Sequence, residues 1–357
     1  YMNTKISPSQ DFFQYVNGTW LNQTEIPSDR TSWGSFNELI KKTDKDAMSI
    51  LKEASKNPKY KSDTDQGKAV NLFSTILDTV GRNKAGIKPL QPYFKKIDAI
   101  KNIADLQKYL TEIGQEGNSV FFGIYIGADE KNSSKNSVML YPNRLGLPDQ
   151  DYYISEDKDS KEKKAKYELH IAKMLGFIGE SPALAKANAS RIIALETALS
   201  NPRLDRVESR DSRLQYNPMT IAELQKITPA IKWDAYFTGL GLAKLDTVVV
   251  MEPKYMKALQ TVFTQNKVAQ WKEYLKWSLL NRTASTLTTD IENANFDFYG
   301  KTLTGALKQR PREEMALQVI NTATGEALGK LYVEKLFPAE AKDKAKKMIA
   351  NVMLAYE

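Results

Sequence analysis

The chain has 357 residues, with 51 lysines and arginines against 43 aspartates and glutamates, which gives a net charge of +8. With 41% hydrophobic and 26% charged residues, this is the composition of a folded protein and excludes a disordered or collagen-like one. There is no cysteine and only one histidine, His170, which excludes thiol nucleophiles, disulfides, thiolate zinc sites, iron–sulfur clusters and any site that needs two imidazoles.

The excess positive charge is spread over mixed runs such as 158–166 and 342–347, which are typical of solvated helix faces. A nucleic-acid-binding protein needs a basic stripe with a recognisable motif, and neither is present, so we expect no nucleic-acid partner. The sequence also contains no run of about 18 apolar residues and therefore predicts no membrane span.

Helical periodicity dominates the first third of the chain. Apolar residues at three- and four-residue steps predict a helix over about 36–55, a second that ends at Gly81, and a third that begins at Ile103 and ends at Gly114. An aromatic cluster lies upstream of these helices, and its spacing predicts an anchoring core. Its members are Phe12, Phe13, Tyr15 and Trp20.

A short β region interrupts this pattern. Two β-rich runs, 120–126 and 138–141, flank the polar turn-forming stretch 128–137 and predict a small hairpin. Residues 246–251 predict one more short strand.

Helices return between and after these strands. A charged helix should end near Gly176 to Gly179 and form a helical hairpin with a helix that begins after Pro182. Thr220 followed by Glu223 fits a capping box, in which each side chain satisfies a backbone N–H at the start of a helix. Further helices are predicted over 253–264, 268–292, 311–337 and 339–357. The fold class is therefore mainly α, a large multi-helix lobe with a small β-hairpin, without an internal repeat or a clear domain seam.

The sequence offers little catalytic chemistry. His170 has no histidine or cysteine co-ligand, and no Gly-x-Ser-x-Gly turn presents a nucleophile to it, so we predict a helix-surface or hydrogen-bonded packing residue. Two acid pairs lie on loops, Asp149 with Asp151 and Glu208 with Asp211. Such pairs usually cap helices or form salt bridges, and general acid–base work is the alternative.

The segment Glu292-Asn-Ala-Asn-Phe-Asp297 could be mistaken for part of a zinc-ligand helix. It lacks a carboxylate four residues after Glu292 and has no histidine partners. We therefore interpret it as a helix end.

The segment Trp33-Gly-Ser-Phe-Asn37 precedes or begins the helix predicted at 36–55. A glycine between aromatic residues allows close backbone approach, while Ser32, Ser35 and Asn37 offer hydrogen-bond donors near a helix N-terminus, where a peptide carboxylate can bind. The alternative is an ordinary helix start with Ser35 as the N-cap.

Five blocks in sequence order resemble one protein family. They are Asp11-Phe-Phe-Gln-Tyr-Val-Asn-Gly-Thr-Trp20, Ile26-Pro-Ser-Asp-Arg30 with Trp33-Gly-Ser-Phe36, Arg144-Leu-Gly-Leu-Pro-Asp-Gln-Asp-Tyr-Tyr153, Glu208-Ser-Arg-Asp211 with Tyr216-Asn217, and Ala327-Leu-Gly-Lys-Leu-Tyr-Val-Glu334. They are similar to the neprilysin-like zinc metalloendopeptidases of family M13, which include the bacterial oligopeptidase O enzymes. The resemblance covers nearly the whole chain.

The resemblance implies the N-terminal portion of a two-lobed enzyme, in which a mainly helical cap lobe covers a thermolysin-like zinc lobe and the cavity between them admits oligopeptides. The family's zinc motifs, including the His-Glu-x-x-His helix, belong to a downstream part and do not occur in this sequence. We expect an N-terminal segment, 1–35, that packs toward the catalytic lobe, and a helical cap lobe over 36–357. Zinc would be held by the C-terminal catalytic half of the same protein, and this chain alone, with no catalytic or metal-binding residue, should be inactive.

One role of the family maps onto this chain. Family members use an arginine and an aspartate, with a phenylalanine between them, to hold the substrate's C-terminal carboxylate at the far end of the primed side, and the matching positions are Ser32, Asn37 and Phe36. Loss of the guanidinium weakens carboxylate capture. We therefore expect substrate contacts from these three residues in an endopeptidase that accepts internal peptide segments.

The resemblance to bacterial members, which are exported or lipid-anchored, implies a periplasmic, cell-envelope or extracellular location. The absence of cysteine agrees with a bacterial protein, since the animal ectodomains of this type are stabilised by disulfides. The alternative function is a stand-alone peptide-binding or structural helical module without catalysis.

Overall fold

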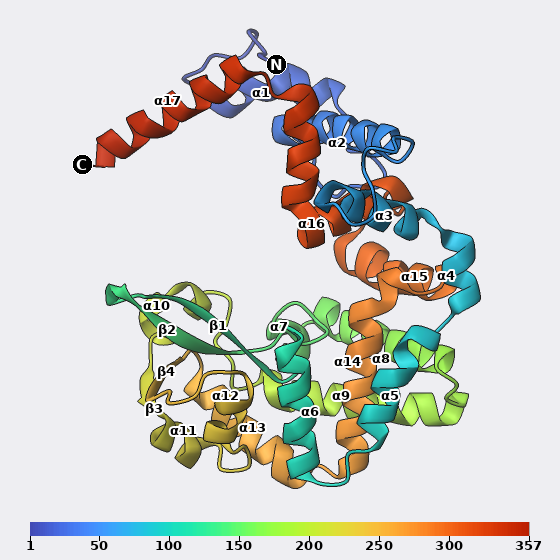
Figure 1. Ribbon diagram of the computed structural model, residues 1–357, viewed down its shortest axis with the longest axis vertical. Coiled ribbons are helices and arrows are strands. Elements are labelled where there is room, and N and C mark those ends of the chain that lie inside the picture. The colour runs from blue at the N-terminus through green and yellow to red at the C-terminus, as the bar shows by residue number, and fades with distance from the viewer. Residues whose placement is uncertain (357) are drawn as a thin grey trace. The chain divides into compact units, whose positions relative to one another are not determined.

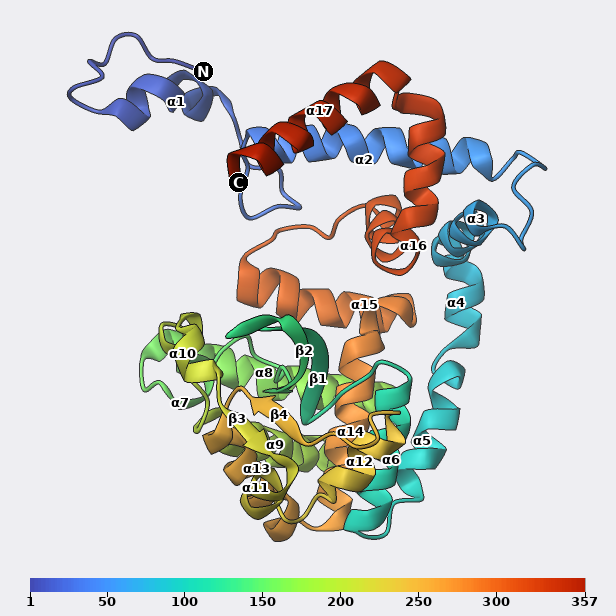
Figure 2. The same cartoon turned by 60° about the vertical axis from the view of Figure 1, so that its left-hand side comes forward.

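The computed structural model describes residues 1–356, and its elements are shown in Figures 1 and 2. The chain forms two compact units, one made of Tyr1–Arg82 with Thr304–Glu357 and the other of Asn83–Leu303. Helices make up most of both units, so the mainly α class is confirmed.

The first unit is built only from helices in the part that the structure describes. Its elements are α1 (Phe12–Gln23), α2 (Ser35–Ala54), α3 (Asp65–Leu77), the beginning of α4 (Thr79–Ala85), α16 (Arg312–Leu336) and α17 (Ala339–Tyr356). Helix α16 packs against α2 and α3, and their apolar side chains form a separate hydrophobic core. The most buried members of this core include Leu51, Ala69, Ala316 and Ile320.

Helix α2 is buried along only half of its length. Its C-terminal half contributes Ala47, Ile50, Leu51 and Ala54 to the core, whereas the side chains of its first turns remain exposed. The apolar stripe that predicted this helix over its whole length is therefore satisfied by packing at one end only.

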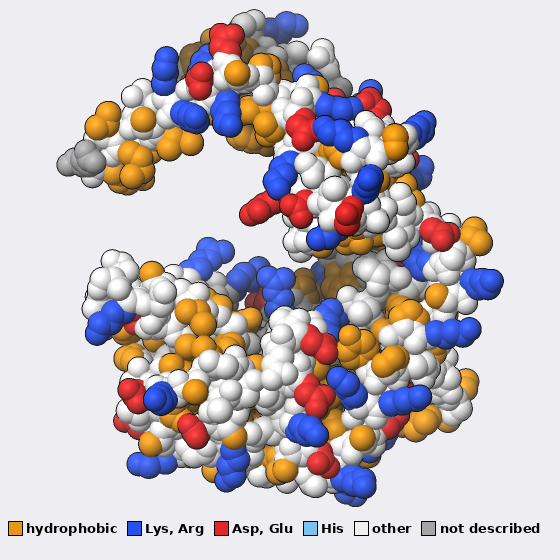
Figure 3. Space-filling model, viewed as in Figure 1, with side chains coloured by type: hydrophobic (Ala, Val, Ile, Leu, Met, Phe, Trp, Pro, Cys, Tyr) orange, Lys and Arg blue, Asp and Glu red, His pale blue; other side chains and the backbone are white. Residues whose placement is uncertain are grey.

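Helix α17 buries none of its residues, although its sequence is amphipathic. Apolar side chains at three- and four-residue steps, Ile349, Val352, Met353 and Tyr356, are all more than half exposed. Figure 3 shows hydrophobic side chains on the surface of this helix. Such a continuous apolar face is typical of a contact surface for another element.

The second unit contains the sheet and most of the shorter helices. Its helical elements are α5 (Gln91–Asp98), α6 (Ile103–Gln115), α7 (Asp151–Ile154), α8 (Lys158–Phe177), α9 (Pro182–Ser200), α10 (Ser212–Gln215), α11 (Ile221–Ile227), α12 (Trp233–Gly239), α13 (Pro253–Gln265), α14 (Val268–Thr283) and α15 (Thr289–Asn295), with the 3₁₀ turns η1 (Lys88–Leu90), η2 (Glu208–Arg210) and η3 (Ala284–Thr286) and the π-helix η4 (Phe296–Thr304). Helices α8 and α9 form the predicted helical hairpin, and α14 packs against both.

The sheet has four strands in the order β1-β2-β4-β3. Strands β1 (Phe122–Asp129) and β2 (Asn132–Pro142) form the predicted antiparallel hairpin, with a register shift between Ala128 and Asp129. Strand β4 (Thr247–Val250), also predicted, lies parallel to β2 and antiparallel to β3 (Pro218–Thr220). Strand β3 was not predicted, because three residues are too few to establish a two-residue period.

Aromatic side chains dominate the core of the second unit. The largest fully buried side chains include Trp233, Trp277, Tyr167, Tyr255 and Phe121. The ring pairs of this core include edge-to-face, tilted and stacked arrangements. This core includes side chains from α8, α9 and α14, and residues of α9 and α14 line the cavity described below.

Several predicted boundaries are confirmed by local hydrogen bonds. The capping box at Thr220 is present, with the Glu223 N–H donating to the Thr220 hydroxyl at 3.2 Å and the Thr220 N–H donating to the Glu223 carboxylate at 2.8 Å. Ser181 caps α9 at its predicted start. Helix α8 ends at Phe177, close to the left-handed residue Gly179, as predicted.

Other predicted boundaries are wrong. No helix ends at Gly81, because α3 ends at Leu77 and Asp78 begins α4 by accepting a hydrogen bond from the Gly81 N–H at 2.8 Å. The single helix predicted over 268–292 is divided between α14 and α15, since Thr288 caps a new helix.

The segment 292–297 contains the end of α15 at Asn295, as predicted, but the chain continues directly into the π-helix η4. The long helix predicted over 311–337 is interrupted at Thr324, which has φ −143° and ψ 34°. In the N-terminal aromatic cluster, Phe12 and Phe13 are 68% and 60% exposed and form no core.

Candidate functional site

The sequence predicted substrate contacts at the start of α2. Gly34, in an extended conformation, occupies the N-cap position, and α2 begins at Ser35. The prediction of Ser35 as N-cap is therefore wrong, and no side chain caps this helix start. Trp33 lies beside it, with the Lys41 ammonium 5.7 Å from the centroid of its ring.

The three predicted residues lie together at this helix start. Ser32 is exposed, Asn37 is half-buried, and the Phe36 side chain is 79% exposed. Leu39 and Ile40, one turn after Phe36 in α2, are also exposed. These three side chains form an apolar face at the start of the helix. This arrangement suits contact with an apolar side chain, and the role of the three residues in substrate binding stays a prediction.

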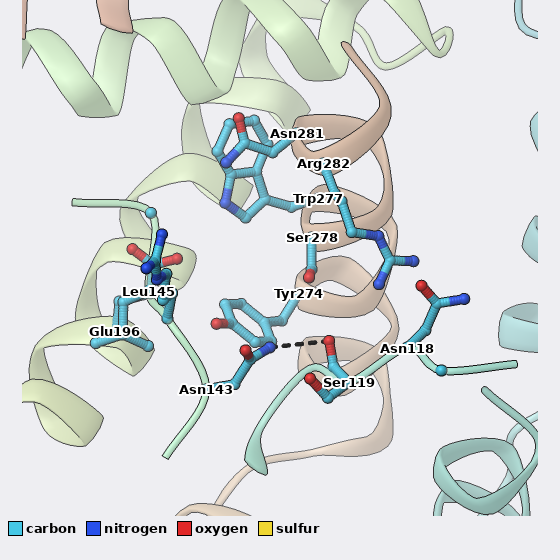
Figure 4. A pocket seen from close by; sticks show the side chains of 13 residues that line it. Asn118, Ser119, Asn143, Leu145, Glu196, Tyr274, Trp277, Ser278, Asn281 and Arg282 are labelled. Carbon is cyan, nitrogen blue, oxygen red and sulfur yellow. Dashed lines mark hydrogen bonds between the residues drawn. The ribbon is translucent and has the colours of Figure 1, made fainter. Parts of the chain in front are cut away.

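The second unit contains a polar cavity of about 350 Å³, shown in Figure 4. Four segments line it: the turn after α6, the loop after β2, α9 through Glu196, and α14. The lining residues are Gly117, Asn118, Ser119, Asn143, Arg144, Leu145, Gly146, Glu196, Tyr274, Trp277, Ser278, Asn281 and Arg282.

A hydrogen-bond network fixes the walls of this cavity. The Asn143 amide nitrogen donates to the carbonyl oxygens of Ser119 and Val120, both at 2.8 Å, and so ties the loop after β2 to the turn after α6 (Figure 4). The Arg203 guanidinium donates to the Asn143 carbonyl at 3.1 Å. Because both segments are tied at their ends, the cavity is formed by the fold and not by loose loops.

Among the residues that the structure describes, Glu196 is the only carboxylate that lines the cavity, and it is buried among hydroxyl donors. Tyr153 donates to Glu196 Oε2 at 2.7 Å and Tyr167 donates to the same oxygen at 3.0 Å. The Tyr153 hydroxyl also accepts a hydrogen bond from the Leu147 N–H at 2.7 Å. Glu196 thus anchors the loop of the Arg144-Leu-Gly-Leu-Pro block from α9.

Burial raises the pKa of Glu196 to about 7, although hydrogen bonds from Tyr153, Tyr167, the Gly146 N–H and Trp277 favour the charged form. Burial, with the nearby Glu196 charge second, raises the pKa of Tyr153 and Tyr167 well above their ordinary value. The tyrosines are therefore neutral donors at every physiological pH.

Gly146 is required by this packing. A Cβ atom at position 146 would lie 1.5 Å from the Tyr167 hydroxyl oxygen, which Glu196 holds in place. The glycine of the Arg-Leu-Gly-Leu-Pro block is therefore explained by a close approach to a fixed hydroxyl group.

His170 is a buried packing residue, as one alternative predicted, and not a surface residue, but its Nε2 has no hydrogen-bond partner within residues 1–356. It stacks on Phe298, with ring centroids 4.9 Å apart, and meets Trp277 and Tyr299 edge to face. Burial, followed by the Lys173 charge, lowers the pKa of His170 to about 4. A neutral imidazole in an aromatic core has no route to catalysis here.

The acid pairs serve as structural contacts. Asp149 and Asp151 both face Arg206, with oxygen–nitrogen distances of 3.2 and 3.4 Å. Asp211 caps α10 and pairs with Arg213 at 2.7 Å. Their interpretation as caps and salt bridges fits these contacts.

The residues that are described do not fit a zinc site. Between residues 1 and 356 there is no group of three or more histidine, aspartate or glutamate side chains that could hold a metal ion. Over the same residues, no helix is long and apolar enough to cross a membrane.

The comparisons with known proteins agree with this architecture. The profile of peptidase family M13 matches residues 8–357, so the chain belongs to this family. The class defined by the fold is thus the M13 peptidases, and the resemblance inferred from the five sequence blocks is confirmed.

Particular relatives are distant in sequence but similar in structure. Endothelin-converting enzyme 1 of Rattus norvegicus is 26% identical over 371 residues, an alignment that covers 100% of this chain and 48% of that protein. Neprilysin-3 of Drosophila melanogaster is 24% identical over 377 residues, which cover 100% of this chain and 48% of that protein. The zinc metalloprotease Zmp1 of Mycobacterium tuberculosis, solved with an inhibitor, has a TM-score of 0.87 and 31% identity over 99% of this chain and 54% of its own.

The chain therefore spans about half the length of the relatives it matches. PepO of Lactobacillus rhamnosis, at 20% identity over 98% of this chain and 55% of its own, shares the fold with a TM-score of 0.81.

Sequence reasoning missed Glu196, Tyr167 and Arg282 as residues of a cavity. One signal was available, since Glu196 interrupts the apolar face formed by Ile192, Leu195 and Leu199 in α9. A carboxylate on a buried helix face requires partners. The partners themselves come from other elements and could not be predicted from spacing.

Proposed function

We propose that this chain forms the non-catalytic lobe of a zinc metalloendopeptidase that hydrolyses oligopeptides. The observation that carries the proposal is the match to family M13 over residues 8–357 by a chain that spans about half of its relatives. The hydrolytic chemistry would be supplied by zinc held in the C-terminal catalytic half of the protein. This chain alone would be inactive, and its role would be to limit access to the reaction chamber and to contact substrate.

The exposed face of α17 supports pairing with the catalytic half. Ile349, Val352, Met353 and Tyr356 form one continuous apolar stripe that is covered by no residue of the described chain. Full burial of such side chains contributes roughly 1.5–3 kcal/mol each. We therefore assign this face, together with segment 1–35, to the contact with the zinc-bearing half.

The start of α2 would contribute the substrate contacts. Phe36 offers an exposed ring and Asn37 and Ser32 offer neutral hydrogen-bonding groups, without the guanidinium that would fix a terminal carboxylate. An apolar, uncharged contact favours peptide segments that continue past the site. The protein would accordingly act as an endopeptidase.

The test is peptide hydrolysis by this chain alone, by the zinc-bearing half alone, and by the two halves joined. The proposal predicts cleavage of oligopeptides only by the joined protein and its complete loss with a chelator. Hydrolysis by the 357-residue chain alone that survives the chelator would contradict it.

A matched pair of variants tests the contact surface. Val352→Asp places a charge in the apolar stripe of α17, and Asn351→Asp places the same charge on the exposed opposite face. We expect Val352→Asp to weaken association of the two halves at least tenfold and Asn351→Asp to leave it unchanged. Equal effects of both variants would show that the stripe is not the contact.

The location follows from the same family resemblance. We place the intact protein in the periplasm, the cell envelope or the extracellular space of a bacterium. Cell fractionation with an antibody against this chain tests the assignment, and recovery in the cytosolic fraction would contradict it.

A further inference from the structure

The polar cavity in the second unit has two arginines without acidic partners. Arg144, in the loop after β2, and Arg282, in the last turn of α14, both line it, and neither has a carboxylate within 4.0 Å among residues 1–356. By contrast, Arg191, Arg206 and Arg213 in the same unit all form ion pairs. Two unpaired guanidinium groups at one cavity favour an anionic ligand.

The one carboxylate of the cavity does not satisfy these arginines. Glu196 is already hydrogen-bonded by Tyr153 and Tyr167 and is 1% exposed. Its oxygens are directed to the tyrosines of α7 and α8 and not to a guanidinium group. The exposed guanidinium groups of Arg144 and Arg282 therefore leave positive charge at the cavity that Glu196 does not pair with.

The remaining polar groups suit an amide next to that anion. In Figure 4 the Arg282 guanidinium lies near the Asn118 carboxamide, and the Ser278 hydroxyl lies between Tyr274 and Trp277 along α14. The side chains of Asn118 and Ser278 form no hydrogen bond within the described chain. A carboxamide offers both a donor and an acceptor, which is the pairing that a peptide N–H and C=O require.

The cavity also has apolar lining. Leu145, Tyr274 and Trp277 provide hydrocarbon and ring surface, and the Asn143 bridge and the Glu196 anchor fix the loop that carries Arg144. A cavity of about 350 Å³ that combines apolar side chains with convergent polar groups has the size of a small-ligand site.

We propose that this cavity binds the C-terminal end of a peptide, with Arg144 and Arg282 supplying the charge for the carboxylate and Asn118 pairing with the preceding amide. The inference rests on the proposed function, because it takes peptides as the ligands of this protein. It adds a carboxylate site that lies entirely in the second unit, whereas the start of α2 belongs to the first unit and lacks the arginine for such a role.

Calorimetric binding to the full 357-residue chain tests this proposal without any catalytic half. The probes are an acetylated Ala-Ala-Leu tripeptide as the free acid, the same tripeptide as its C-terminal amide, and sodium acetate. We expect the acid to bind at least tenfold more tightly than the amide or acetate. Arg144→Gln and Arg282→Gln should each weaken binding of the acid about tenfold and leave the amide unchanged.

A matched control separates local from overall charge. Arg213→Gln removes the same charge from an arginine of this unit that lies outside the cavity and is 88% exposed. It should leave binding of the acid unchanged, and circular dichroism with thermal melting should show that all three variants fold alike.

Each other outcome overturns a stated part of the proposal. Equal affinity for acid and amide, or equal loss in all three arginine variants, would exclude a carboxylate site at this cavity. Equal affinity for acetate and the tripeptide acid would show that the site binds a simple anion and does not recognise a peptide end. Failure of these binding tests with intact chelator-sensitive cleavage by the joined halves would reject the cavity site and leave the proposed function standing.

Discussion

Glu196 and His170 should each make the unfolding free energy of the second unit depend on pH, with opposite signs. Glu196→Gln removes the ionisable proton and keeps an oxygen that can accept from Tyr153 or Tyr167. His170→Phe keeps a ring on Phe298 and removes a nitrogen, Nε2, that has no hydrogen-bond partner within residues 1–356. Each variant is compared with the unmodified chain at every pH, so that all other titrating groups cancel.

The sign for Glu196 follows from a folded pKa of about 7 against 4.5 in the unfolded chain. Between these values the folded state holds a proton that the unfolded state has lost. The stability that protonated Glu196 contributes is therefore complete below pH 4.5 and is lost as the pH rises to 7. At 1.36 kcal/mol per pKa unit, the loss amounts to about 3 kcal/mol.

His170 has the opposite sign, because its folded pKa is about 4 and its unfolded value is 6.5. Below pH 6.5 the imidazole is protonated in the unfolded chain but stays neutral in the folded one. The stability that neutral His170 contributes is therefore lost as the pH falls to 4. The size is again about 3 kcal/mol. In the unmodified chain the two effects nearly cancel over the shared interval.

Urea unfolding at one-unit steps from pH 4 to 8 measures both effects. Tryptophan fluorescence reports on the second unit when Trp20 and Trp33 of the first unit are replaced by phenylalanine in all chains compared, since Trp233, Trp271 and Trp277 are all buried in the second unit. Relative to the unmodified chain, Glu196→Gln should gain about 3 kcal/mol from pH 4 to pH 8, and His170→Phe should gain about 3 kcal/mol from pH 7 to pH 4. A difference that is constant with pH for either variant would refute the burial argument for that residue.

Three further substitutions test the packing, the substrate contact and the capping. Gly146→Ala should lower the free energy of unfolding in urea by about 3 kcal/mol, because its Cβ meets the Tyr167 hydroxyl. Gly176→Ala, with open space around it, should not destabilise α8. Equal losses in the two variants would contradict the close approach at Gly146. Phe36→Ala should change KM or the choice of cleavage site in the joined enzyme and leave its zinc content unchanged, because the ring is exposed, and unchanged kinetics across several peptides would remove Phe36 from the site. Thr220→Ala should lower the stability by about 1 kcal/mol through loss of the capping box, and an unchanged urea midpoint would show that the cap contributes nothing.

The sequence was sufficient for elements whose signal is local. The apolar periods of α6, α8 and α9 and the Thr220–Glu223 box depend on residues a few positions apart, and the structure contains all of them. Helix ends were less predictable where a side chain starts a new helix, as Asp78 does before Gly81. Here one hydrogen bond decides between a helix end and a helix interior.

The cavity depends on long-range contacts, and this is why it could not be predicted. Asn143 meets Ser119 across 24 residues and Tyr153 meets Glu196 across 43 residues. The Arg144-Leu-Gly-Leu-Pro block identified the family, but only the structure relates its glycine to Tyr167 and its loop to Glu196. The α17 stripe was visible as a helix pattern, whereas its exposure required the fold.

The central claim is that the proposed peptidase holds its catalytic metal outside this chain. Its most direct test is the zinc content of the purified 357-residue chain after dialysis against a zinc-containing buffer and then a metal-free one, measured beside the joined protein. The account predicts about one zinc ion per molecule in the joined protein and none above background in this chain. A stoichiometric zinc ion retained by residues of the 357-residue chain alone would contradict it.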